Sequence, residues 1–204
     1  ADFFDDSARM ERLAVIFADK YLNALRLWEG GRRPPDAWGV TFAAADDGRR
    51  RTITQHLLAG MNAHINLDLG IAAAEVPNAD LDHMHEDFVR VNSILFARLD
   101  GLQGILGSVS RRMALIDRVG VSLDERIMRM AIGSARDQAW DLAVDLTTRP
   151  GSKQAIIADR DRGTAEWGAA ILGDNPMVRF LSRIVARTEP RDVTVALDAF
   201  APGP

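Results

Sequence analysis

The chain has 204 residues, which is enough for one domain with a sizeable core. Its 47% apolar and 26% charged residues are typical of a globular protein, and its net charge of −4 gives no indication of nucleic-acid binding. The absence of cysteine excludes disulfides, thiolate catalysis and Cys-ligated metals. Because the acidic N-terminal sequence ADFFDDSARMER also lacks the apolar core of a signal peptide, we expect a cytoplasmic protein.

Helical periodicity runs along the chain, while strand signals are weak throughout. Apolar residues recur every three or four positions between capping residues and Gly or Pro, which predicts several long helices with shorter ones between and after them. The long ranges are 7–28, 52–75, 79–106, 122–148 and 152–172. We therefore predict an all-α protein: a single domain over residues 1–204, forming a compact bundle of about eight helices around a buried central helix at 52–75.

The predicted central helix carries unusual polar residues in an apolar setting. From residue 52 it reads TITQHLLAGMNAHINLDLGIAAA, and its one charged residue is Asp68. At about 100° per residue, His56, His64 and Asp68 share one stripe, and apolar side chains cover most other directions. A helix that is apolar almost all round belongs in a core, so we expect these three side chains to lie where water is scarce. The same polar groups make a membrane span costly, and we expect none.

The next predicted helix adds titratable residues in the sequence DHMHEDFVRVN. His83 and Asp87 are four positions apart, the spacing at which two side chains meet on one helix face. The loop before this helix is short, so the two helices should be antiparallel neighbours. This arrangement predicts that His83 and Asp87 lie near His64 and Asp68.

Nitrogen and oxygen ligands gathered in one cleft suit a divalent ion such as Zn²⁺, Mn²⁺ or Fe²⁺. We therefore expect His56, His64, Asp68 and His83 to bind a metal, with Asp87 as a further ligand or general base. Two alternatives stay open. In the first, the cleft would be a polar pocket without a metal. In the second, His64 with Asp68 and His83 with Asp87 would be structural pairs that satisfy each other's hydrogen bonds in the core.

A third segment, ARDQAW, places Arg136 and Trp140 four positions apart on one helix face. A guanidinium near an indole would suit an anionic group of a substrate. The alternative is a surface arginine that lies along a half-buried tryptophan.

The sequences NAHINLDL, DFVRVN, ARDQAW and RPPDAW together resemble a bacterial family, common in actinobacteria, of domains of unknown function (family 5995), from about Tyr21 to Leu146. The resemblance implies that several polar and aromatic residues occupy motif positions, namely Asn62, His64, Asn66, Asp68, Asp87, Asn92, Arg136 and Trp140. His83 and His85 match no motif position. More distantly, HLLAGMNAH is similar to a helix of the zinc-dependent phospholipase C group, which is all-α and binds zinc through His and Asp. The N-terminal Trp ligand of that group is replaced here by Ala1.

Three functional hypotheses follow. The first is an enzyme for metal-assisted hydrolysis of a small or lipid-like substrate, with His64, Asp87 and Arg136 as catalytic residues. The second is a metal-free biosynthetic enzyme of bacterial secondary metabolism, such as a cyclase, isomerase or dehydratase, in which His64 and Asp87 exchange protons. The third is a non-catalytic small-molecule binding or scaffold protein, and the apolar helices would also permit a homodimer. The expected substrate-binding residues are Asn62, Asn66 and Asn92, whose amides would orient a carbonyl, together with Trp140.

Overall fold

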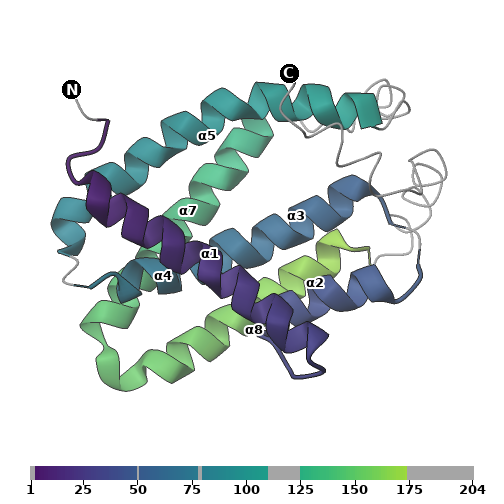
Figure 1. Ribbon diagram of the computed structural model, residues 1–204, viewed down its shortest axis with the longest axis horizontal. Coiled ribbons are helices and arrows are strands. Elements are labelled where there is room, and N and C mark those ends of the chain that lie inside the picture. The colour runs from purple at the N-terminus through teal and green to yellow at the C-terminus, as the bar shows by residue number, and fades with distance from the viewer. Residues whose placement is uncertain (1–2, 50, 78–79, 110–124, 174–204) are drawn as a thin grey trace.

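The computed structural model describes residues 3–49, 51–77, 80–109 and 125–173, and these residues form helices joined by short loops, with no strand among them (Figure 1). This confirms the predicted all-α class. The α-helices are α1 (Ser7–Glu29), α2 (Asp36–Asp46), α3 (Ile53–Ala63), α4 (Leu69–Glu75), α5 (Leu81–Val109), α7 (Glu125–Thr148) and α8 (Lys153–Ile171). A π-helical turn, η1 (His64–Asp68), joins α3 to α4, and a short 3-10 turn, η3 (Pro150–Ser152), precedes α8.

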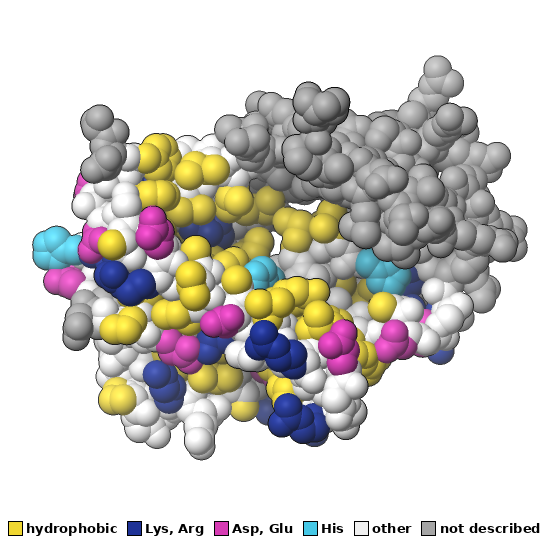
Figure 2. Space-filling view, viewed as in Figure 1, with side chains coloured by type: hydrophobic (Ala, Val, Ile, Leu, Met, Phe, Trp, Pro, Cys, Tyr) yellow, Lys and Arg dark blue, Asp and Glu magenta, His cyan; other side chains and the backbone are white. Residues whose placement is uncertain are grey.

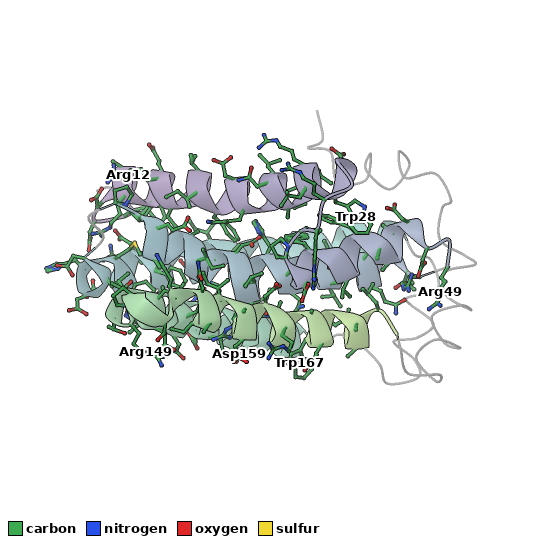
Figure 3. All side chains as sticks on the ribbon, turned by 90° about the horizontal axis from the view of Figure 1, so that it is seen from below. Arg12, Trp28, Arg49, Arg149, Asp159 and Trp167 are labelled. Carbon is green, nitrogen blue, oxygen red and sulfur yellow. The ribbon has the colours of Figure 1, made fainter. Side chains whose placement is uncertain are left out.

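The segment α3–η1–α4 packs against several other helices. Figure 3 shows α1 on one side of this segment and α8 on the other, and the segment contacts α1, α2, α7 and α8. Small and apolar side chains make these contacts possible, and those with at most 1% exposure are Ala59, Ala63, Leu67, Ala72 and Ala73. The site described below lies where η1 faces α1 and α5.

Local sequence explains where the segment α3–η1–α4 begins and how closely it packs. The side chain of Thr52 caps α3 by accepting a hydrogen bond from the backbone N–H of Gln55, and Oε1 of Gln55 accepts one from the backbone N–H of Thr52. Gly70 lies where α4 crosses α7, because a Cβ atom there would stand 2.5 Å from the carbonyl oxygen of Ala139. The absence of a side chain at this position therefore sets the distance between the two helices.

Two carboxylates from distant parts of the chain hold helix N-termini. Asp161 of α8 accepts hydrogen bonds from the backbone N–H groups of Asp36 and Ala37, at 2.7 and 2.8 Å, and so fixes the start of α2. The start of α1 is capped locally by Asp6, whose side chain accepts from the backbone N–H of Arg9 at 2.8 Å. Asp87 binds the residues just before α1, as described below.

The boundaries differ from the predicted ones by a few residues at most helix ends. The larger difference is inside the predicted helix 52–75, which contains the π-helical turn. Shorter helices are also expected between 106 and 122 and after 172, and these stretches lie mostly outside the described residues, so the expected count of about eight stays a prediction. Among the described helices, none combines the length and the apolar character that crossing a membrane requires.

Candidate functional site

The π-helical turn is the local feature from which the site is built. The N–H of Leu69 bonds to the carbonyl of His64, five residues back, whereas an α-helix would use the carbonyl four residues back. The turn is wider by one residue, and it contains the HINLD part of the NAHINLDL motif. Such turns occur often at functional sites, because they redirect side chains within an otherwise regular helix.

His64 and Asp68 form a direct pair across this turn. Nδ1 of His64 lies 2.9 Å from Oδ2 of Asp68, whose side chain is 3% exposed. Nε1 of Trp38 donates a second hydrogen bond, also 2.9 Å long, to the same oxygen. Where Asp68 is ionised and the imidazole is neutral, Nδ1 of His64 carries the ring proton and Nε2 keeps a free lone pair, because a carboxylate only accepts hydrogen bonds.

Aromatic side chains fix the orientation of the His64 ring. Phe17 of α1 stacks on it, with ring centroids 3.6 Å apart and an interplanar angle of 9°. Tyr21 meets it edge-on at 6.2 Å, and Trp38 lies 5.9 Å away at a tilt. The imidazole is therefore held by packing on one face and by Asp68 at one nitrogen, while its side chain keeps 27% exposure.

His64 lines a cavity of about 670 Å³ between α1, α5, α7 and the segment α3–η1–α4. This volume lies in the range of small-molecule sites. Figure 2 shows hydrophobic side chains gathered around a hollow on this face of the molecule. The apolar side chains that line the cavity include Met10, Leu13, Phe17, Ile65, Val91 and Leu95. The cavity therefore offers an apolar surface with the imidazole of His64 in its wall.

Arg136 of α7 lies in the wall of the same cavity and is only 5% exposed. Its Nη2 donates a 2.5 Å hydrogen bond to the carbonyl of Phe88, and its guanidinium carbon lies 4.3 Å from the centre of the Phe88 ring. Its Nε is buried and forms no hydrogen bond with the described residues. Burial lowers the pKa of Arg136 to about 10, although the nearby charge of Asp137 opposes the shift.

Asp87 is placed elsewhere than expected. Its oxygens accept hydrogen bonds from the backbone N–H groups of Asp5 and Asp6, at 2.8 and 3.0 Å, and from Arg9 and Arg90, at 3.2 and 2.8 Å. The side chain is fully buried among these donors, and it does not line the cavity of His64. The expected meeting of Asp87 with His64 is therefore corrected, because Asp87 anchors the start of α1 to α5.

Burial by itself raises the pKa of Asp87, but the backbone donors of Asp5 and Asp6, with the Arg9 and Arg90 guanidinium groups, outweigh this and hold the pKa below its ordinary value. The carboxylate is thus ionised at neutral pH. A group that stays ionised and fully bonded is poorly suited to act as an acid or base.

The four expected metal ligands are not brought together. His56 and His64 are eight residues apart, which is about 12 Å along a helix axis and too far for one ion. His83 pairs with Asp80 at 2.8 Å instead of Asp87, and its side chain is 80% exposed. In the part of the chain that the structure describes, no group of three or more His, Asp or Glu side chains is arranged to bind a metal.

Asn62 and Asn66 lie on another side of the segment α3–η1–α4 from His64. Nδ2 of Asn62 donates to the carbonyl of Thr164 in α8 at 2.8 Å, and Nδ2 of Asn66 donates to Oδ1 of Asn62 at 3.0 Å. The two amides line a second, polar cavity of about 530 Å³ next to α7 and α8, together with Asp159 and Trp167, which Figure 3 places along α8. The structure therefore separates them from the imidazole.

The remaining expected site residues lie near Phe88. Trp140 is half-buried and packs against the core, and its ring centroid lies 4.8 Å from that of His85 and 4.9 Å from that of Phe88. Oδ1 of Asn92, one turn beyond Phe88 on α5, is buried and has no hydrogen bond within the described residues. Neither residue contributes to the lining of the His64 cavity.

Trp38 and Phe17 are the site residues that the sequence reasoning missed. Trp38 holds the carboxylate that orients His64, and Phe17 stacks on the imidazole. The position of Trp38 in the RPPDAW motif was the available signal for its role. Phe17 lies in no motif, and nothing in the sequence separated it from the other apolar residues of its helix.

The chain belongs to a family of unknown function, DUF5995, whose model matches residues 1–174. This match confirms the resemblance that the four motifs indicated, and it does not extend to the phospholipase C group. No curated protein and no solved structure matches the chain significantly.

Proposed function

We propose that the protein is a metal-free acid–base enzyme that acts on a small, largely apolar molecule bound in the His64 cavity. The observation that carries the proposal is the His64–Asp68 pair in the cavity wall. An imidazole whose Nδ1 proton is held by a buried carboxylate keeps Nε2 available to accept a proton. Asp68 would also stabilise the imidazolium that forms, which is the role of the aspartate in catalytic triads.

Isomerisation, cyclisation and dehydration are the reaction types that fit, because each requires a proton to be taken from carbon or oxygen. Asp87 and the amides of Asn62 and Asn66 have no part in this proposal, since their partners lie elsewhere. Metal-assisted hydrolysis has weaker support, because its expected ligands are dispersed over α3, η1 and α5.

Proton abstraction can be tested before the substrate is known. Apolar carbonyl compounds are incubated with the protein in D₂O, and deuterium incorporation at acidic carbon atoms is measured by mass spectrometry. We expect exchange with at least one compound, and we expect His64→Gln to slow it by about 100-fold, the usual contribution of a general base. Asp68→Asn should slow it as well, because an amide in place of the carboxylate no longer fixes the ring tautomer.

His83→Gln is the matched control, because the His83 imidazole is exposed, lies near the start of α5 and does not line the cavity. It should leave the exchange unchanged. Exchange that survives in His64→Gln would contradict the proposal, and exchange that is lost after dialysis against a chelator would favour the metal-dependent alternative.

A non-catalytic small-molecule binding protein is the second candidate, favoured by the predominantly apolar lining of the cavity. It predicts that compounds bind to the protein without any exchange, and that His64→Gln changes affinity only slightly.

A further inference from the structure

The cavity contains a buried cation whose charge is not balanced by the described residues. Arg136 is 5% exposed, yet its one hydrogen bond is to the neutral carbonyl of Phe88. A guanidinium has five N–H donors, and here Nε is buried without a partner. Transfer of an unpaired charge from water into a protein interior is costly, so such groups are normally paired.

Three other partly buried arginines follow this rule, whereas Arg160 is partly buried and, among the described residues, bonds only to Gln138. Arg9 and Arg90 both bind Asp87, and Arg51 binds Asp47 through two nitrogens. Arg136 forms no ion pair with any described carboxylate. Although burial lowers its pKa to about 10, it remains protonated at neutral pH. The buried Arg136 therefore lies in the apolar wall of the cavity without a counterion among the described residues.

The lining of the cavity decides which counterion would fit. Apart from the imidazole of His64, Arg136 is the one basic side chain among the described residues that line the cavity. The one acidic side chain among them is that of Glu11, which is exposed. The single permanent positive charge of Arg136 would therefore balance a ligand with a single negative charge. Apolar side chains from α1, η1 and α5 would cover the remainder of the ligand.

We propose that the cavity binds an amphipathic monocarboxylate, whose carboxylate pairs with the guanidinium of Arg136 and whose apolar chain lies along Leu13, Phe17 and Ile65. This inference rests on the proposed function, because it assigns a substrate class to the same cavity. Pairing would balance the charge of Arg136, while the chain passes the imidazole of His64. A carboxylate is favoured over a phosphate monoester because the wall offers a single cation for the head group.

Binding is measured by isothermal titration calorimetry with ligands that share one apolar chain and differ in the head group: decanoate, decan-1-ol, decyl phosphate and decyltrimethylammonium. We expect decanoate to bind at least about tenfold more tightly than decan-1-ol, because a hydrogen bond between charged groups adds affinity of that size. Arg136→Met should lose this preference while its affinity for decan-1-ol stays within about threefold, because Met keeps the apolar part of the side chain.

Arg136→Lys keeps the charge and serves as the second variant if Arg136→Met unfolds, and it should retain part of the preference for decanoate. Arg160→Met is the control, because this arginine contacts Gln138 and lines the other cavity. It should bind decanoate like the wild type.

Equal affinity of the wild type for decanoate and decan-1-ol, or unchanged decanoate binding by Arg136→Met, would overturn the inference. Tighter binding of decyl phosphate than of decanoate would overturn the carboxylate assignment. The two proposals are separated by their readouts, since decanoate binding by Arg136→Met tests the inference, whereas deuterium exchange by His64→Gln tests the proposed function. Deuterium exchange that occurs only with neutral compounds would overturn the inference that the ligand is a carboxylate, and it would still support the proposed function.

Discussion

Gly70→Ala is expected to lower the free energy of unfolding by about 3 kcal/mol, the upper end of the usual cost of overpacking a core. The new Cβ would lie 2.5 Å from the carbonyl oxygen of Ala139, and 2.8 and 2.9 Å from Cδ2 and Cβ of Leu142. The first of these atoms is backbone, and Leu142 is 1% exposed. Relief would require α4 and α7 to move apart, which separates side chains in the main core. Urea denaturation followed by circular dichroism measures the change.

Gly163→Ala is the matched control in α8. A Cβ atom at this position meets nothing within 4 Å among the described residues. The substitution should therefore stabilise the protein by about 0.5–1 kcal/mol, because alanine has the higher helix propensity. Equal stability of Gly70→Ala and the wild type would show that α4 and α7 do not cross as closely as described.

Asp87→Asn is expected to lower the free energy of unfolding by about 3 kcal/mol at neutral pH, as is usual when one partner of a buried charged network is removed. The amide cannot accept all the hydrogen bonds that Asp5, Asp6, Arg9 and Arg90 donate to the carboxylate. Because its pKa is lower in the folded protein than in the unfolded chain, the carboxylate stabilises the fold above the unfolded value of about 3.8.

This contribution is lost as the pH falls through the lowered pKa of Asp87, so the difference in stability between wild type and Asp87→Asn should shrink in acid. Glu86→Gln is the control on the same helix, because its exposed side chain pairs with Arg90 only at 3.4 Å. It should change stability by less than about 1 kcal/mol. A variant Asp87→Asn as stable as Glu86→Gln would show that Asp87 does not anchor α1.

Periodicity was sufficient to predict the helical class and most helices, because amphipathic spacing is repeated over many turns and does not depend on distant contacts. The pairing of His64 with Asp68 was predictable for the same reason, since both lie within one turn of the same helix. The π-helical turn was not predictable in this way. One additional residue in a turn leaves no periodic signal, yet it shifts every side chain that follows.

The partners of Asp87 and Asn62 could not be inferred from local spacing. Asp87 binds the residues before α1, more than eighty positions away, and Asn62 binds Thr164 in α8. Spacing on one helix shows which side chains share a face, and only the packing of the bundle decides which neighbour that face meets. The expectation for Arg136 depended on the same packing, which places it in the wall of the cavity.

The central claim is that an imidazole oriented by a buried carboxylate faces an apolar, ligand-binding cavity. Nitrogen-15 NMR of the histidine rings at about pH 8, where an ordinary imidazole is neutral, tests it most directly. We expect His64, assigned from the spectrum of His64→Gln, to carry its proton on Nδ1 and to leave Nε2 unprotonated. Added decanoate should shift the Nε2 resonance of His64 and leave that of His83 unchanged. A proton on Nε2 of His64, or a ring that does not respond to the ligand, would contradict the account.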